Sequence, residues 1–172
     1  DRRFQPGDIV QWDCGCQYHG YFSDFIRMAV MGPPTPRQRR NFDVAREAMD
    51  AAVQAVQPGA TGADVVKAAH DVFDRAGYGE FTRRCRETGR DSAGHNLGLD
   101  VHEPPAVSLR ATDPLEPGQV ICVEPFLIED GAYPFERARA FYVLEAVVLI
   151  TETGHEIFSH EDLLSHELYV VE

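Results

Sequence analysis

The stretch Val10-Gln-Trp-Asp-Cys-Gly-Cys-Gln-Tyr-His-Gly-Tyr-Phe-Ser-Asp-Phe-Ile-Arg27 predicts a β-hairpin that carries two carboxylates. Both arms are rich in aromatic and β-branched residues, and the centre, residues 18–20, has the composition of a turn. If two of these three residues form the loop, side-chain alternation places Asp13 and Asp24 on the same face, directly opposite or diagonal. Like charges so placed repel each other, and a bound cation is the usual compensation. The hairpin alone is also compatible with two solvated carboxylates.

Length and charge restrict the possible classes of function. A chain of 172 residues, 44% of them hydrophobic, is expected to form one globular domain over residues 1–172. The net charge of −12 argues against a nucleic-acid partner, because little in the sequence would neutralise phosphates along a face. No apolar run reaches the length of a membrane span and no signal peptide is recognisable, so we expect no membrane partner.

The four cysteines favour a reduced, cytoplasmic protein, because none of them forms a spaced Cys-x-x-Cys pair. They are Cys14, Cys16, Cys85 and Cys122. Cys14 and Cys16 flank the proposed carboxylate site, but strand alternation points them away from the face of Asp13. We therefore expect buried thiols at these positions rather than metal ligands.

After the hairpin, the chain predicts two helices. The first is capped by Thr35 and ends at Pro58-Gly59, and the second is capped by Thr61 and runs up to Gly77. Both have apolar residues at helical spacing. His70 lies off the apolar stripe of the second helix, and we expect it to be solvated.

The second half of the chain predicts strands at residues 95–101, 119–129, 138–151 and 156–158. The order is a hairpin, two helices and then several strands with little helix between them. This order indicates an α+β fold rather than a doubly wound parallel sheet.

Three residues in this half have the character of metal ligands. His95 lies between glycines, where backbone or ligand can approach closely, and Glu124 ends an apolar strand. Glu145 is embedded in the nearly all-apolar stretch 141–150 with no alternating Lys or Arg, so a metal ion is a better partner than an Arg from elsewhere. Together with the two hairpin aspartates they form a hard, oxygen-rich set suited to Mn²⁺, Co²⁺, Fe²⁺ or Zn²⁺. Five ligands are too many for one catalytic zinc and about right for two metals that share carboxylates.

The motifs around these ligands resemble a known family. They are Gly20-Tyr-Phe-Ser-Asp24-Phe-Ile-Arg27, Gly94-His95, Gly98-Leu-Asp-Val-His102-Glu-Pro-Pro105, Leu115-Glu-Pro-Gly118, Val123-Glu124-Pro125, and Glu145 before Leu149-Ile-Thr-Glu-Thr-Gly154. In order and spacing they resemble the pita-bread metallopeptidases, which include aminopeptidase P, prolidase, methionine aminopeptidase and creatinase. The sequence from Leu99 to Pro105 is most similar to that of the proline-directed branch.

The resemblance implies a pita-bread fold, with a curved, mostly antiparallel sheet and helices on its outer face. It also implies two divalent metal ions, Mn²⁺ first, with Co²⁺, Zn²⁺ or Fe²⁺ as alternatives. Asp13 would chelate one ion, His95 and Glu124 the other, and Asp24 and Glu145 would bridge both.

The resemblance further assigns the catalytic residues and the partners. Glu124 would take a proton from water held between the ions, and His102 would hydrogen-bond the carbonyl oxygen of the substrate. The expected partners are a peptide or small amide substrate and a second copy of the chain in a homodimer.

The sequence departs from the family pattern at several places. A family histidine upstream of the first aspartate has no counterpart here, so we expect the C-terminal two-thirds of a pita-bread domain. Val143 and Ile128 replace a family Arg and Tyr, which puts Xaa-Pro specificity in doubt. The predicted function is an Xaa-Pro aminopeptidase or dipeptidase-like metallopeptidase. The alternatives are a creatinase-like hydrolase or lyase acting on a small non-peptide substrate, and a catalytically inactive binding module.

Overall fold

The structure is a computed structural model that describes residues 2–129, 140–158 and 167–171. Its helices are α1 (Pro36–Gln54), α2 (Gly62–Arg75) and α3 (Gly79–Thr88). Its strands are β1 (Ile9–Cys14), β2 (Gln17–Tyr18), β3 (Tyr21–Phe22), β4 (Phe25–Met31), β5 (Ser92–Asn96), β6 (Glu103–Ser108), β7 (Val120–Val123), β8 (Phe126–Ile128), β9 (Phe141–Val143), β10 (Ala146–Ile150), β11 (His155–Ile157) and β12 (Tyr169–Val171). No helix in these ranges is long and apolar enough to cross a membrane.

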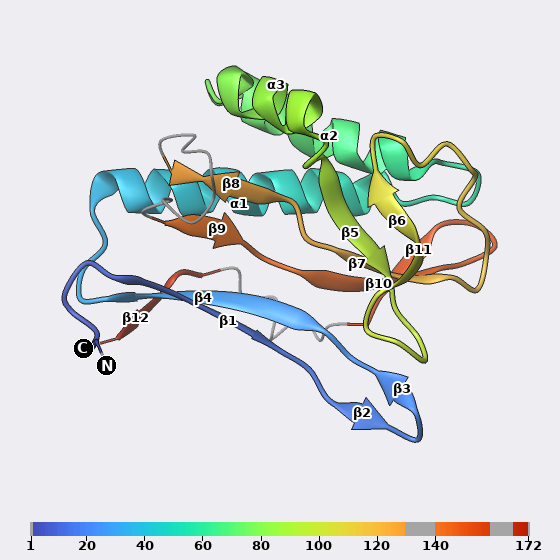
Figure 1. Ribbon diagram of the computed structural model, residues 1–172, viewed down its shortest axis with the longest axis horizontal. Helices are drawn as coiled ribbons and strands as arrows, with labels where there is room; N and C mark the ends of the chain where they lie inside the picture. The colour runs from blue at the N-terminus through green and yellow to red at the C-terminus, as the bar shows by residue number, and fades with distance from the viewer. Residues whose placement is uncertain (1, 130–139, 159–166, 172) are drawn as a thin grey trace.

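The largest sheet has five strands in the order β11-β10-β7-β5-β6, and all its neighbours pair antiparallel. A second sheet has the order β1-β4-β12, in which β12 runs parallel to β4. The three helices lie together on one side of the five-stranded sheet, and β1 and β4 lie on the other side (Figure 1). The predicted α+β class, with a mostly antiparallel sheet, is confirmed.

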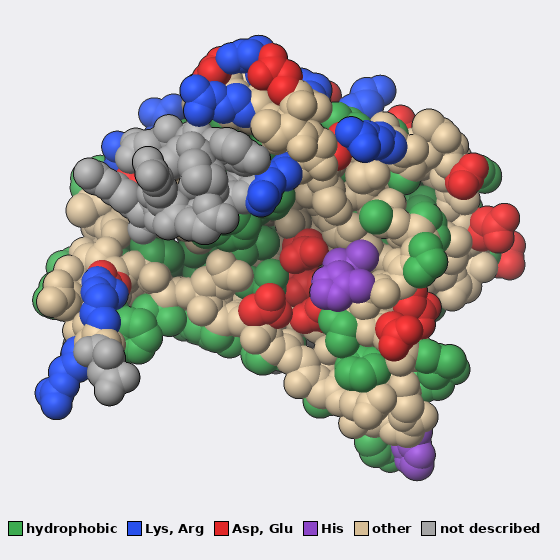
Figure 2. Space-filling model, in the orientation of Figure 1, with side chains coloured by type: hydrophobic (Ala, Val, Ile, Leu, Met, Phe, Trp, Pro, Cys, Tyr) green, Lys and Arg blue, Asp and Glu red, His purple; other side chains and the backbone are tan. Residues whose placement is uncertain are grey.

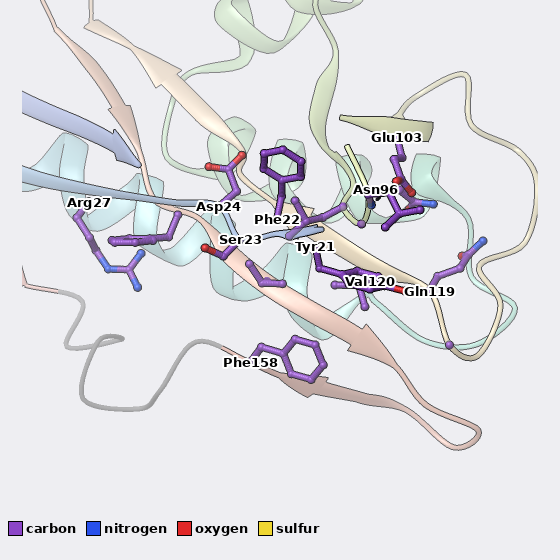
Figure 3. A pocket seen from close by; sticks show the side chains of 16 residues that line it. Tyr21, Phe22, Ser23, Asp24, Arg27, Asn96, Glu103, Gln119, Val120 and Phe158 are labelled. Atoms are coloured by element: carbon purple, nitrogen blue, oxygen red, sulfur yellow. Dashed lines mark hydrogen bonds between the residues drawn. The ribbon is translucent and has the colours of Figure 1, made fainter. Parts of the chain in front are cut away.

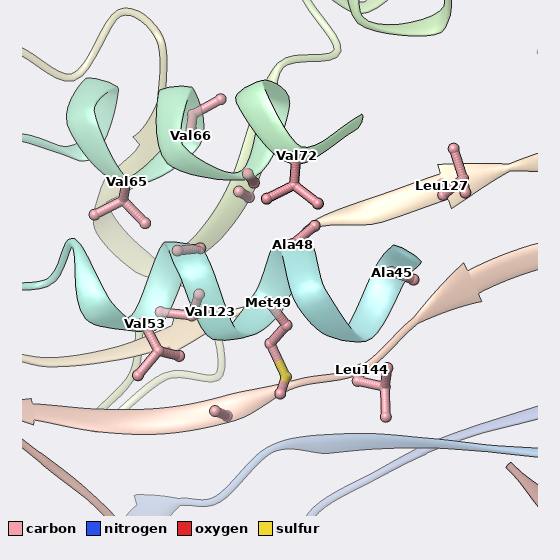
Figure 4. Close-up of a cluster of buried hydrophobic side chains, with 14 of the residues drawn as sticks. Ala45, Ala48, Met49, Val53, Val65, Val66, Val72, Val123, Leu127 and Leu144 are labelled. Atoms are coloured by element: carbon pink, nitrogen blue, oxygen red, sulfur yellow. The ribbon is translucent and has the colours of Figure 1, made fainter. Parts of the chain in front are cut away.

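The hydrophobic core lies between α1, α2 and the helix-facing side of the strands. Met49 of α1 points toward Leu144, and Val65 and Val72 of α2 point toward α1 (Figure 4). Val123 of β7 belongs to the same buried cluster. The helices therefore cover one face of the sheet with apolar contacts and leave the other face free for a polar site.

The two predicted helices are confirmed, and both begin with a capping box. Thr35 accepts a hydrogen bond from the backbone of Gln38, and Thr61 accepts one from that of Asp64, while the side chains of Gln38 and Asp64 bond back to the caps. The side-chain amide of Gln38 also donates a hydrogen bond to the backbone carbonyl of Gly7 at 2.8 Å, which connects α1 to the segment before β1.

Helix α3 was not predicted, because its inward face is narrow. Its first residue follows Tyr78, which makes no side-chain cap, and Phe81, Thr82 and Cys85 are its buried residues. Ion pairs of Arg83 with Glu80 and Glu87 cover the outward face. Such a helix has little apolar periodicity for a sequence pattern to show.

The predicted hairpin is confirmed, with a two-residue loop at His19-Gly20. Both loop residues have positive φ (51° and 90°), as a type I′ turn requires. Asp13 pairs with Ile26, so Asp24 lies two residues away on the same face, diagonal to Asp13. The ladder is interrupted at Gly15, where a Cβ atom would lie 1.9 Å from the carbonyl oxygen of Ser23.

Several predicted strand boundaries were wrong. The stretches 119–129 and 138–151 each form two strands, which break at Glu124-Pro125 and at Leu144-Glu145, and residues 138 and 139 lie outside the described residues. Strand β5 ends at Asn96, so residues 97–102 form a loop. Strands β6 and β12 were missed, and the two prolines of β6 are typical of a loop or an edge strand. The strand expected at 156–158 is present as β11.

Two expectations about single residues were also wrong. Cys14 and Cys16 are exposed rather than buried, because they lie on the arm of the hairpin that projects from the body (Figure 1). His70 is buried, with 7% of its surface exposed. It lines a small internal space together with Phe81 and Cys85 of α3, so the missed helix is what covers it.

Candidate metal centre

The five predicted ligands come from five different places in the fold. Asp13 lies near the end of β1, Asp24 just before β4, His95 on β5, Glu124 just after β7 and Glu145 just before β10. Figure 2 shows acidic side chains gathered beside histidine at the centre of one face of the molecule.

Strand register explains why the sheet residues meet on one face. Ile121 and Val123 of β7 are in the helix-covered core, so residues 122 and 124 point to the opposite side. His95 lies directly opposite residue 122, and Val123 pairs with Ala146. The residues adjacent to that pair, Glu124 and Glu145, are therefore neighbours on the free face.

The imidazole of His95 is oriented toward the carboxylates. Its Nε2 atom lies 3.5 Å from Oε1 of Glu124 and 3.9 Å from Oδ2 of Asp24. Its Nδ1 atom lies 3.0 Å from the carbonyl oxygen of Asn96. If Nδ1 donates its proton to that carbonyl, the Nε2 lone pair faces the carboxylate cluster, which is the usual orientation of a metal-binding histidine.

Glu145 is the most deeply buried carboxylate of the group, with 1% of its surface exposed. Within the described part of the chain, neither carboxylate oxygen has a hydrogen-bond partner. Arg27 donates to the backbone carbonyl of Glu145 at 3.0 Å, not to its carboxylate. Burial raises the pKa of Glu145 to about 8; the nearby Cys122 thiol opposes this rise, and the charge of Glu124 adds to it.

The other carboxylates show the same mutual repulsion. Burial raises the pKa of Glu124 to about 7, and the charges of Asp24 and Asp13 add to the rise. Burial also raises the pKa of Asp24, and the charge of Asp13 raises it further. Such a group is costly without a compensating cation, and a divalent ion would supply one. The residues present therefore fit the metals that the sequence predicted.

His102 lies beside the carboxylate cluster, on the loop after β5. The centre of its ring is 4.1 Å from that of His95. The carboxylate of Glu103 holds the loop by accepting hydrogen bonds from the backbone of Leu99 at 2.6 Å and of Asp100 at 2.9 Å. The loop is also joined to the hairpin, because the Phe22 backbone donates to the Gly98 carbonyl. The cleft, of about 400 Å³, is lined by Asp13, Asp24, His95, His102 and Glu124 among others.

The sequence profile of metallopeptidase family M24 matches residues 1–152. The chain belongs to this family. An Xaa-Pro dipeptidase from Lactobacillus helveticus is 34% identical over 159 residues, which are 92% of this chain and 39% of that protein.

Solved structures agree with the M24 assignment. A dipeptidase from Mycobacterium ulcerans superposes with a TM-score of 0.83 at 35% identity, over 99% of this chain and 42% of that one. A prolidase from Pyrococcus furiosus superposes with a TM-score of 0.79 at 32% identity, over 93% of this chain and 43% of that one. The predicted pita-bread fold is confirmed, and the chain spans about two fifths of the length of these M24 relatives.

One residue of this candidate metal cluster was not predicted from the sequence. Ligand atoms of Asp24, His95, Cys122 and Glu145 all lie within 4.8 Å of one another. Cys122 precedes Glu124 by two residues in a strand, so the same alternation that placed Glu124 could have placed it.

A larger cavity of about 710 Å³ adjoins the candidate ligands at Asp24. Phe22, Val120 and Phe158 line it, and the Asp24 carboxylate points away from Phe158 (Figure 3). Val143 and Ile128, which replace the family Arg and Tyr, do not line this cavity. Both are 1% exposed and lie on the paired strands β9 and β8.

Proposed function

We propose that this protein is a metal-dependent hydrolase of the peptidase type that uses two divalent ions, Mn²⁺ first. The buried Glu145 carboxylate supports this most directly, because within the described residues its oxygens have no hydrogen-bond partner. A buried charge in that state needs a cation, and His95 presents Nε2 to the same place.

Each residue has a role in this proposal. Asp13 would bind one ion, and His95 and Glu124 the other. Asp24 and Glu145 would lie between the two, consistent with the repulsion that their carboxylates feel from their neighbours. When bound, the ions would supply water that is readily deprotonated at neutral pH and charge that stabilises a developing oxyanion.

The chain's own residues would carry the proton transfers. Glu124 borders the cleft, and its carboxylate would accept a proton on Oε1 and return it later. His102 borders the same cleft and would donate a hydrogen bond to the carbonyl oxygen of the scissile amide. Glu103 would keep His102 in place through its bonds to the preceding loop.

The substrate class follows from two opposing observations. The relatives include Xaa-Pro dipeptidases and a prolidase, and the motif Asp100-Val-His-Glu-Pro-Pro105 resembles the proline-directed branch. Val143 and Ile128, however, supply neither the guanidinium fork nor the phenol expected there. We propose that Xaa-Pro peptides are hydrolysed weakly and that another small amide is preferred. The homodimer and the cytoplasmic location stay predictions.

The test is steady-state turnover with Mn²⁺. Xaa-Pro dipeptides, longer Xaa-Pro peptides and a panel of small amides are compared, and Asp24→Asn serves as the control that removes a ligand. We expect kcat/KM for Xaa-Pro peptides below the usual enzyme range of about 10⁴–10⁸ M⁻¹s⁻¹, and a higher value for a small amide. Xaa-Pro turnover inside that range, lost in Asp24→Asn, would show that the missing Arg and Tyr do not matter. Metal binding without turnover of any substrate would favour the binding-module alternative.

A further inference from the structure

Cys122 is a buried thiol that does not belong to the hydrophobic core. Its neighbours in β7, Ile121 and Val123, pack in the core cluster under the helices, whereas Cys122 points to the opposite face. There it lies across from His95 on one side and Val147 on the other. The thiol is therefore placed beside the candidate ligand His95, with Val147 as its neighbour on the other side.

The distances suit a single coordination sphere. Bonds from a divalent metal to nitrogen, oxygen and sulfur are about 2.0–2.3 Å long, so ligand atoms on opposite sides of one ion lie about 4.0–4.6 Å apart. The Cys122 sulfur and the ligand atoms of Asp24, His95 and Glu145 fall within 4.8 Å of one another. A second observation points to a ligand at the same place, because both oxygens of the buried Glu145 carboxylate lack a hydrogen-bond partner within the described residues.

We propose that Cys122 binds, as a thiolate, the ion that is also held by His95, so that this position prefers Zn²⁺ or Co²⁺ to Mn²⁺. This inference rests on the proposed metal centre, adds a soft ligand to it, and replaces Mn²⁺ as the preferred metal at this one position. Thiolate ligands select softer metals, whereas an all-oxygen and imidazole set accepts Mn²⁺ readily.

The binding step is a proton exchange without oxidation. The S–H bond of Cys122 breaks, its proton passes to the buffer, and the sulfur electron pair forms the bond to the metal. The positive charge of the ion stabilises the thiolate that binds to it. Wild-type protein should therefore release more protons per bound ion than a variant without this thiol.

Two other thiols must be separated from Cys122 in any test. Cys14 and Cys16 are exposed and line the same cleft, so either could bind an added metal at its rim. A purely structural Cys122, donating its proton to Glu145, must also be distinguished. Serine keeps a small donor at residue 122 but cannot supply a thiolate, so Cys122→Ser is the informative substitution.

The experiment is titration of the metal-free 172-residue protein with Co²⁺, followed by absorption spectroscopy and by competition with Zn²⁺ and Mn²⁺. We expect a thiolate-to-cobalt charge-transfer band in the near ultraviolet for wild type and for the Cys14→Ser/Cys16→Ser control. In Cys122→Ser the band should be absent although Co²⁺ still binds, and the preference for Zn²⁺ over Mn²⁺ should fall by about tenfold or more.

The possible failures separate the two proposals. Co²⁺ bound by wild type without the band would overturn the role of Cys122 and leave the metal centre intact. A band lost only in Cys14→Ser/Cys16→Ser would assign the thiolate to the hairpin and overturn it as well. Absence of Co²⁺ binding to wild type would overturn both proposals. If Cys122→Ser does not fold, the spectra of wild type and of the hairpin control decide.

Discussion

At the candidate metal centre, single buried carboxylates are electrostatically unfavourable in the absence of a cation. Glu145 sits just before a core strand with its carboxylate buried, and Arg27 satisfies its backbone carbonyl rather than its charge. When it is ionised, a carboxylate in such a place destabilises the metal-free protein. The metal centre proposed above accounts for its presence.

We predict that Glu145→Gln stabilises the metal-free protein and removes its response to metal. At pH 8 without metal, the melting temperature should rise by about 2–6 °C, because a neutral amide replaces a poorly compensated charge. Added Mn²⁺ should raise the melting temperature of wild type but not that of the variant. Glu156→Gln, on the exposed side of β11, is the matched control and should change neither value. A variant less stable than wild type without metal would contradict the assignment of Glu145.

The metal-free protein should lose stability as the pH rises. Its unfolded chain deprotonates Glu124 and Glu145 near their ordinary pKa of 4.5, whereas the folded pKa values are about 7 and about 8. The folded state thus holds extra protons between these values, and the stability that they contribute is complete below pH 4.5 and lost as the pH passes through 7 to 8. Urea unfolding at about pH 5.5 and about pH 8.5 should show a fall on the order of 5 kcal/mol when the two carboxylates are added together. A flat profile, or a rise, would show that protein groups already compensate the carboxylates.

Among the elements, those with local determinants were predictable from the sequence. The two capped helices and the hairpin were found because capping boxes, turn residues and alternation act over a few residues. The strand breaks at Glu124 and Glu145 were missed, because an apolar stretch gives no sign of where a strand ends to present a ligand. Helix α3 was missed because its ion-paired face hides a narrow apolar one.

The hairpin's geometry depends on Gly15. A side chain at residue 15 would collide with the carbonyl of Ser23. At the same place the two arms of the hairpin are joined by a hydrogen bond from the Ser23 amide to the Cys16 carbonyl. Gly15→Ala should therefore destabilise the protein by at least about 2 kcal/mol in urea unfolding and weaken metal binding, because Asp13 and Asp24 lie on either side of it. Gly79→Ala is the control: its nearest contact would be an ordinary 3.7 Å, and we expect little change. Equal stability of the two variants would contradict this prediction, because it would mean that the two arms of the hairpin can move apart at residue 15 without loss of stability.

At the scale of the whole molecule, the meeting of the candidate ligands could be predicted only in part. The sequence named five of them from local chemistry and from resemblance, and the fold brings them to one face from five separate elements. What local patterns could not show is which side chains other elements cover. His70 was expected to be solvated, yet the unpredicted α3 covers it; Cys14 and Cys16 were expected to be buried, yet their hairpin projects from the body. Cys122 was assigned to no site, because its importance depends on the strands paired beside it.

The central claim is that this face of the sheet holds two divalent ions, and the count of ions tests it most directly. Metal-free protein is dialysed to equilibrium against Mn²⁺, or against Co²⁺ or Zn²⁺, and bound metal per chain is measured by mass spectrometry. We predict about two ions per wild-type chain with the preferred metal, and a clear loss in Asp24→Asn, which removes a ligand shared by both ions. Glu156→Gln should bind as wild type does. No bound metal in wild type, or an unchanged count in Asp24→Asn, would contradict the assignment of this cluster as a dinuclear centre.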